Sequence, residues 1–290
     1  MPVPRLTVLM GPTAAGKTER ALAWAAREDA WILSADALQF YRGADLGTAK
    51  PTPAERASVP HYGIDGAEPG EPWDVRRYAD YAREVVDEAA RAGVPVLVVG
   101  GSGLYLSVFH APPPDPVEIP PAVREEVAAL AAAGGTRALR ERLLSLDRNP
   151  PVDLHNPRRL APALERVLAT GLPVRELQRR HAERPCAFAD CEREWFLLDR
   201  PDEELVDRIE RRTARMLAAG LLAEVRALAT RGLRANPTLA SAIGYREALE
   251  VLDGDREEAT LETAINQATF RLVRRQRRWF ARRMPEAVAL

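Results

Sequence analysis

The chain has 290 residues, with 41 Lys and Arg against 42 Asp and Glu, which gives a formal net charge of −1. Its 46% hydrophobic and 29% charged residues are typical of a globular protein, and they exclude wholesale disorder, collagen and disulfide scaffolds. No apolar run approaches the ~20 residues needed to cross a bilayer, and the N-terminus does not read as a signal peptide. The sequence therefore predicts a cytoplasmic protein without membrane contact.

Two scarce residue types carry further information. Cys186 and Cys191 are the only cysteines, so we expect reduced thiols and neither a disulfide framework nor a zinc site. All but two of the 41 basic residues are Arg, and the exceptions are Lys17 and Lys50. A site built for a compact ammonium rejects a planar guanidinium, so we interpret both lysines as functional, with chance retention as the alternative.

The first hundred residues alternate between predicted strands and helices. Apolar runs predict strands at 5–10, 30–35 and 94–101. Helix formers occupy 17 to about 28, and a second helix is capped by Asp74 and ends before Gly93. Residues 37–72, rich in Gly and Pro, predict loops around short elements. This order predicts an α/β fold, a parallel-sheet core with helices on both faces.

The composition changes at residues 112–116, which read PPPDP. Helical periodicity then dominates, with predicted helices at 121–133, 136–146, 157–170 and 173–182. An apolar strand returns at 194–199, and helices follow, ending in a long one at about 255–283. We therefore predict three parts: 1–114, the first part of the core; 115–193, an inserted all-helical domain; and 194–290, the core continuation and a helical C-terminal region.

A phosphate-binding loop is the most specific motif. Residues 11–18 match G-x-x-x-x-G-K-[ST] directly after a strand and at the start of a helix, and they are Gly11, Pro12, Thr13, Ala14, Ala15, Gly16, Lys17 and Thr18. Loop amides and the helix N-terminus attract phosphate, Lys17 supplies charge, and the Thr18 hydroxyl faces a Mg²⁺ ion. The sequence predicts a polyphosphate or nucleotide site, which would also accept ATP weakly.

The usual metal-binding acid of an NTPase is missing from one strand end. The run 96–99 leads into Gly100 and Gly101 instead of an Asp. The second strand delivers Asp36 to the same edge of the sheet, where ligands bind. We interpret Asp36 as a general base, or as a metal ligand through water, with a turn cap as the alternative.

Four ordered motifs resemble the tRNA dimethylallyltransferases, also called tRNA isopentenyltransferases, of the bacterial type. They are GPTAAGKT, SADALQFYRGADLGTAKP at 34–51, VVGGSGLY at 98–105 and SAIGYRE at 241–247. The resemblance runs from about residue 6 to residue 283. It implies transfer of a dimethylallyl group from dimethylallyl diphosphate to N6 of the adenosine 3′ of the anticodon, in tRNAs that read codons beginning with U.

The resemblance also implies roles for individual residues. The phosphate loop would hold the donor's diphosphate with Mg²⁺, Asp36 would deprotonate the adenine amine, and Arg226 would grip the diphosphate from the far side. Ser102 stands where the family usually has Thr, and its hydroxyl would contact the donor's bridging oxygen. The adjoining residues Ala37, Leu38 and Gln39 would contact the flipped-out base.

Further arginines are predicted to bind the tRNA anticodon stem-loop. By resemblance these are Arg124, Arg158, Arg159 and Arg246, although NPRRLAPALE at 156–165 departs from the family's usual PQRLSRALE. The segment 271–283 carries seven Arg and no acid, which favours an anionic partner and adds Arg274, Arg275, Arg277 and Arg278. Leu272, Trp279 and Phe280 are expected to form its inward stripe. By resemblance we expect a monomer.

Three alternatives stay open from the sequence. A relative that prenylates free AMP would need neither the helical insertion nor the basic helix. A small-molecule kinase with the same loop would need two phosphate substrates and a lid that carries Arg. A non-catalytic tRNA-binding protein with a relic loop is disfavoured by the intact Lys17, Thr18 and Asp36.

Overall fold

The computed structural model describes residues 3–112, 117–284 and 286–290. The chain divides into two compact units: unit 1 contains Met1–His110 and Ala187–Leu290, and unit 2 contains Ala111–Cys186. Among the described residues, no helix is both long and apolar enough to span a bilayer. Each unit has its own hydrophobic core.

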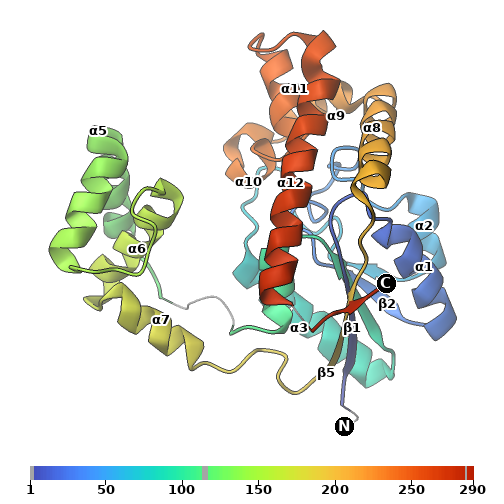
Figure 1. Cartoon of the computed structure of the whole chain (residues 1–290), viewed down its shortest axis with the longest axis horizontal. Coiled ribbons are helices and arrows are strands. Elements are labelled where there is room, and N and C mark those ends of the chain that lie inside the picture. The colour runs from blue at the N-terminus through green and yellow to red at the C-terminus, as the bar shows by residue number, and fades with distance from the viewer. Residues whose placement is uncertain (1–2, 113–116, 285) are drawn as a thin grey trace. The chain divides into compact units, whose positions relative to one another are not determined.

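Unit 1 is built on a parallel sheet, which in the described residues has six strands in the order β3-β2-β4-β1-β5-β6. Figure 1 labels β1, β2 and β5 of this sheet. The strands are β1 Arg5–Met10, β2 Trp31–Ser34, β3 His61–Tyr62, β4 Val96–Gly100, β5 Glu192–Leu197 and β6 Val288–Ala289. Because all strands are parallel, their carboxyl ends share one edge of the sheet. The predicted α/β core is confirmed.

Helices cover both faces of this sheet. Helix α1, Lys17–Glu28, packs through Ala21 and Ala25 against Leu9, Ile32 and Leu97. Helix α3, Val75–Ala92, is capped by Asp74 and ends at Gly93, as its sequence predicts. The connections through α1 and α3 run in opposite directions along the sheet, so right-handed crossovers place these helices on opposite faces. The short helices are α2 Pro53–Ser58 and α4 Gly103–Leu106.

The C-terminal helices of unit 1 form a second core beside the sheet (Figure 1). They are α8 Asp202–Ala218, α9 Leu221–Ala229, α10 Pro237–Ala240, α11 Tyr245–Leu252 and α12 Leu261–Arg283. Phe40 and Tyr41, from the loop after β2, are buried among them. In α12 the buried residues include Val273 and Phe280, whereas the predicted inward residues Leu272 and Trp279 are half-buried. This packing joins the loop after β2 to the C-terminal helices.

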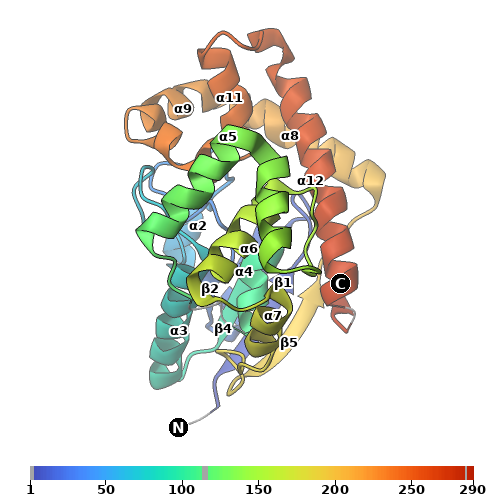
Figure 2. The ribbon, with the colours of Figure 1, turned by 90° about the vertical axis from the view of Figure 1, so that its left-hand side faces the viewer.

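Unit 2 is all-helical, with α5 Pro121–Leu146, α6 Pro157–Thr170 and α7 Val174–Ala182. Helices α5 and α6 lie side by side (Figure 2) and bury Val127, Leu139, Leu160 and Leu164. The two helices predicted at 121–133 and 136–146 share one element that is interrupted at Gly135, whose φ of 58° and ψ of −149° are not helical.

The predicted domain boundaries differ from those of the two units. The boundary at 114 falls among residues 113–116, which lie outside the described residues. At the other end, unit 2 stops at Cys186 and not at 193. The reason is that Phe188 is buried against Phe109, and β5 already begins at Glu192 by pairing with β1. Residues 187–193 therefore belong to the core unit.

Candidate functional site

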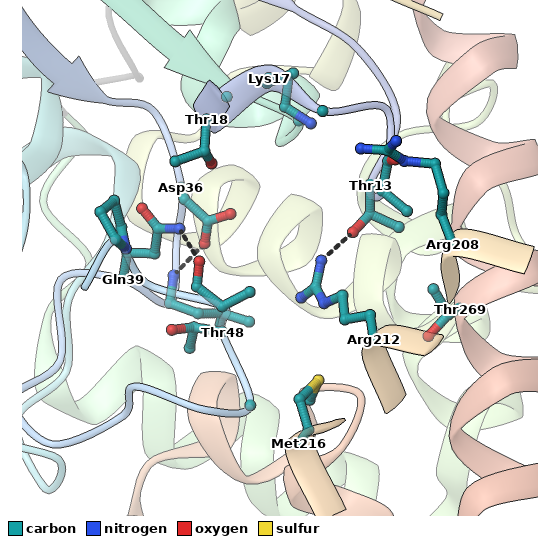
Figure 3. Close-up of a pocket in the computed structure, with 18 of the residues that line it drawn as sticks. Thr13, Lys17, Thr18, Asp36, Gln39, Thr48, Arg208, Arg212, Met216 and Thr269 are labelled. Atoms are coloured by element: carbon teal, nitrogen blue, oxygen red, sulfur yellow. Dashed lines mark hydrogen bonds between the residues drawn. The ribbon is translucent and has the colours of Figure 1, made fainter. Parts of the chain in front are cut away.

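A pocket of about 990 Å³ lies in unit 1 at the edge where β1, β2 and β4 end. Its walls come from the phosphate loop, residues 34–51 after β2, the end of β4, and helices α8 and α12. Figure 3 shows Lys17 and Thr18 at one end, with Asp36 and Arg212 pointing into the space from opposite walls. The pocket therefore brings together the loop and the acid that the sequence singled out.

The phosphate loop is held in shape by contacts to its carbonyl groups. Gly16 caps α1 with a φ of 95°, a backbone conformation that side chains rarely adopt. Arg208 donates to the carbonyl of Ala14 at 2.7 Å, and Arg200 donates to that of Ala15 at 2.8 Å. Because these carbonyls are bound from outside, the loop amides and the α1 N-terminus can serve an anion.

Two cations border the loop inside the pocket. Burial lowers the pKa of Lys17 to about 8, although the attraction of Asp36 opposes this shift. The Lys17 ammonium donates to the carbonyl of Pro12 at 2.8 Å. Arg212 donates to the Thr13 hydroxyl at 2.9 Å, and burial lowers its pKa while Asp36 acts to raise it. Enclosed cations of this kind are matched to an anionic ligand such as a diphosphate.

Asp36 both caps a turn and faces the pocket. Its Oδ1 accepts from the amide of Leu38 at 2.8 Å. In the described part of the chain no hydrogen bond is made by its Oδ2, and Asp36 lines the pocket. The cap and the general base proposed from the sequence are therefore compatible, because they use different oxygens.

The residues beside Asp36 are placed in different ways. Gln39 lines the pocket, with its Oε1 accepting from the Ser34 hydroxyl at 2.8 Å. Leu38 lines the pocket and, like Ala37, is half-buried. Ser102 follows the pocket residue Gly101 and caps α4 without a side-chain hydrogen bond, so its hydroxyl is not used by the cap.

The contact of Arg226 with the diphosphate stays a prediction, which its position in the structure does not support. This arginine is exposed on α9 and does not line the pocket, whereas Arg208 and Arg212 on α8 do. The position of α8 after β5 places its arginines at the sheet edge beside the phosphate loop. Arginines four residues apart on one face of a helix, directly after a strand, were the signal that sequence reasoning missed.

Two further arginines predicted to bind tRNA pair with carboxylates of the protein. Arg277 forms ion pairs with Asp199, at 2.8 Å, and with Asp202. Arg246 pairs with the buried Glu247. The acids that hold Arg277 are brought to it by tertiary packing, whereas the acid beside Arg246 is its neighbour in sequence. The contacts of both arginines with tRNA stay predictions.

The other predicted arginines are exposed. Arg274, Arg275 and Arg278 lie on the outer side of α12, and within the described ranges none of them forms an ion pair. In unit 2, Arg124 lies on α5, and Arg158 and Arg159 lie in the first turn of α6, all exposed. These six side chains are available to an anionic partner.

Lys50 is bound by two carboxylates and a backbone carbonyl, which the sequence did not reveal. Its side chain is 1% exposed, and its ammonium lies 2.6 Å from Asp65, 2.7 Å from Asp45 and 2.8 Å from the carbonyl of Tyr41. Burial acts to raise the pKa of Asp65, but hydrogen bonds from Lys50 and Arg56 lower it. Lys50 therefore fixes the loop after β2 that forms one wall of the pocket.

Replacing Lys50 with Met is expected to lower the free energy of unfolding by about 2 kcal/mol, because the buried ammonium and its hydrogen bonds to a carbonyl and to partly exposed carboxylates are lost. Urea unfolding measures this change. Arg27→Met is the control, since Arg27 pairs with Glu28 on the surface and its loss should cost under about 0.5 kcal/mol. Equal midpoints for the Lys50 variant and the wild type would contradict the role given to Lys50.

The same loop is held from the other side by Glu224. Its carboxylate accepts from the amides of Asp45, Leu46 and Gly47, and from the Tyr245 hydroxyl at 2.7 Å. Burial, followed by the charge of Glu224, raises the pKa of Tyr245. Two of the sequence motifs, residues 34–51 and 241–247, therefore meet in one network.

The side chains that line the pocket fit a magnesium ion whose other ligands are water and the phosphates of a bound substrate. Among residues 3–112, 117–284 and 286–290, no group of three or more His, Cys, Asp and Glu side chains could hold a metal. Thr18 and Asp36 nevertheless line the same pocket. Mg²⁺ usually keeps several waters and binds through one or two carboxylates plus substrate phosphates, which this sparse donor set matches.

One strand end near the loop does carry an acid. Asp199 follows β5, which pairs with β1, but both of its carboxylate oxygens are hydrogen-bonded by Arg277. Asp199 does not line the pocket. The acid that a nucleotide hydrolase would use to bind the metal is thus hydrogen-bonded to Arg277 of α12.

Two family models match the chain. One, described as IPP transferase, matches residues 39–283. The other, described as isopentenyl transferase, matches residues 4–63.

Curated relatives and solved structures agree with these matches. The tRNA dimethylallyltransferase of Opitutus terrae is 47% identical over 287 residues, covering 98% of this chain and 92% of that protein. The one from Myxococcus xanthus is 40% identical and covers 99% and 92%. The full-length tRNA isopentenylpyrophosphate transferase of Bacillus halodurans superposes with a TM-score of 0.71 at 30% identity, covering 99% and 89%. A eukaryotic dimethylallyltransferase, described as acting on tRNA, shares the fold with a TM-score of 0.77 at 21% identity, covering 96% and 70%.

Proposed function

The chain belongs to the IPP transferase family, and we propose that it transfers a dimethylallyl group from dimethylallyl diphosphate to N6 of an adenosine in tRNA. The acceptor is the adenosine 3′ of the anticodon, in tRNAs that read codons beginning with U. The product is N6-isopentenyladenosine. Transfer of a prenyl group to tRNA is the activity named for the curated relatives.

One observation carries this proposal. A phosphate loop, two enclosed cations and a carboxylate line a single pocket, with Asp36 and Arg212 on opposite walls (Figure 3). The cations suit a diphosphate leaving group, and the carboxylate suits a nucleophile that must lose a proton. A nucleotide-dependent phosphoryl transfer usually uses a strand-end acid to hold the metal, and here both carboxylate oxygens of Asp199 are hydrogen-bonded by Arg277.

The chemistry follows from this placement. The N6 lone pair attacks C1 of the dimethylallyl group, the bond between C1 and the bridging oxygen breaks, and diphosphate leaves. Asp36 accepts the proton released from N6. Lys17, Arg212 and the loop amides stabilise the negative charge that develops on the diphosphate. Ser102 is the proposed contact to the bridging oxygen.

Magnesium is the proposed cofactor. Thr18, and Asp36 through a water molecule, would hold the ion beside the diphosphate. When bound, it neutralises the leaving group as a Lewis acid.

The tRNA is proposed to bind through its anticodon stem-loop. Gln39, Leu38 and Ala37 lie beside Asp36, where the acceptor base must enter, and the exposed arginines of α12 suit a phosphate backbone. In unit 2, Arg124, Arg158 and Arg159 are the proposed contacts. We propose that a monomer carries out the reaction in the cytoplasm, where tRNA is found.

The acceptor position is tested with tRNA variants and mass spectrometry of nuclease fragments. A cognate tRNA should gain one dimethylallyl group in the fragment that contains the adenosine 3′ of the anticodon. Changing that adenosine to guanosine should abolish the gain, and changing the third anticodon base from adenosine should reduce it strongly. Prenylation of another fragment at the same rate would contradict the proposed position.

The outer face of α12 is tested by its salt dependence. Neutralising Arg274, Arg275 and Arg278 together should weaken binding to all tRNAs and flatten the slope of log K against log salt by about 0.7–0.9 per lost phosphate contact. The control is Arg277→Ala, because Arg277 forms an ion pair with Asp199. This variant should leave the slope unchanged and lower the stability of the protein. An unchanged slope in the triple variant would place the tRNA on another surface.

A further inference from the structure

Gln276 of α12 joins two segments of the pocket that lie far from it in sequence. Its Oε1 accepts from the amide of Thr13 in the phosphate loop at 3.0 Å. Its Nε2 donates to the carbonyl of Gly101, just past β4, at 2.9 Å. Gln276 also lines the pocket itself. One side chain therefore ties the loop after β1 to the loop after β4.

A side-chain amide of this length can make both bonds. An amide carries a donor and an acceptor at one tip, whereas a carboxylate only accepts and a thioether forms neither bond well. Gly101 leaves room for this contact, because a Cβ there would lie 2.7 Å from Nε2 of Gln276 and 3.0 Å from the carbonyl of Gly11. The contact is thus specific at both ends.

The neighbours of Gln276 hold α12 firmly at this place. Arg277 is bonded to Asp199 and to the carbonyl of Arg200. Trp279 packs onto Gly103, where a Cβ would lie 2.4 Å from its ring. Gln276 therefore extends from a fixed backbone, and it can set the position of the Thr13 amide and not merely follow it.

We propose that Gln276 is a positioning residue for the reaction: it fixes the phosphate loop relative to the end of β4 and so prepares the site for the prenyl diphosphate. This inference rests on the proposed function of the loop as a diphosphate site. Thr13 is central to that site, because its hydroxyl also accepts from Arg212. Loss of the amide bond would leave the loop and its arginine free to shift together.

The test compares Gln276→Met with Gln267→Met in steady-state assays with dimethylallyl diphosphate and tRNA. Met keeps the length but makes neither hydrogen bond, and Gln267 is exposed on the same helix. We expect Gln276→Met to raise the KM for dimethylallyl diphosphate about tenfold, since two net hydrogen bonds of about 1 kcal/mol each are lost in part. The KM for tRNA should stay within twofold, and Gln267→Met should match the wild type.

A second variant approaches the contact from its other end. Gly101→Ala displaces the Gln276 amide, so it should raise the same KM, and the double variant should be no worse than the more damaging single one. Equal effects on both substrates, a fully additive double variant, or a wild-type KM in Gln276→Met would overturn the positioning role.

Calorimetric titration with dimethylallyl diphosphate and Mg²⁺ tests the role of Gln276 separately from the proposed function. If the wild type binds the diphosphate and Gln276→Met binds it equally well, only the role of Gln276 fails. If the wild type does not bind it, the proposed function fails and the inference falls with it. Weaker binding by Gln276→Met, with unchanged unfolding midpoints, is the result expected.

Discussion

Replacing Asp36 by Asn is expected to lower the rate of prenyl transfer by about 10²–10⁴-fold, because the general base is lost. Asn keeps an oxygen that can accept from the amide of Leu38, so the turn should survive. The affinity for tRNA should therefore stay within a few-fold. Single-turnover assays with saturating substrates measure the chemical step, and filter binding measures the affinity.

Asp153→Asn is the matched control for this variant. Asp153 caps the amide of His155 through the same two-residue spacing, at 3.0 Å, but it lies on the exposed surface of unit 2. It should react at the wild-type rate. If Asp36→Asn also kept that rate, Asp36 would be a turn cap only, and another group would have to take the proton.

Lys17→Arg is expected to be as damaging as Lys17→Ala, with a loss of about 10²–10³ in kcat/KM, the usual cost of removing one charge-stabilising donor. The buried ammonium donates to the Pro12 carbonyl and faces the pocket, with Arg212 close enough to affect its pKa. A planar guanidinium presents its donors in a different geometry from a compact ammonium, so it should not replace these contacts. Kinetic assays of both variants check this, and near-normal activity of Lys17→Arg would mean that lysine is retained there by accident.

The pKa of Lys17 adds a pH dependence to this prediction. Burial lowers that pKa to about 8, and only the protonated form attracts a diphosphate. The KM for dimethylallyl diphosphate should therefore rise as the pH passes about 8, and the slope approaches tenfold per pH unit. Lys17→Ala should lose this inflection, because the titrating group is gone. The same inflection in the variant would assign it to another residue.

The parts of the site that the sequence predicted are those that local geometry determines. The phosphate loop needs only a strand, a glycine-rich turn and a helix start, which are contiguous in residues 5–28. Asp36 reaches the pocket because parallel strands end at one edge of the sheet. Neither inference needed knowledge of contacts between segments that are far apart in the sequence.

The parts that the sequence did not predict depend on contacts between distant segments. Arg212 and Gln276 reach the loop only because α8 and α12 pack beside it. A charge run cannot reveal that Arg277 faces Asp199 while Arg274, Arg275 and Arg278 are exposed. The acidic partners of the buried Lys50 lie 5 and 15 residues away along a folded loop, so its role could not be read from the motif alone.

The most direct test of the central claim asks which substrate the phosphate loop binds for reaction. The protein is incubated with Mg²⁺ in three separate mixtures: with ATP, with dimethylallyl diphosphate and AMP, and with dimethylallyl diphosphate and unmodified tRNA. Nucleoside analysis should find isopentenyladenosine only in the third, with diphosphate released in equal amount. ADP formed at a catalytic rate in the first mixture, or prenylated AMP in the second, would contradict the account.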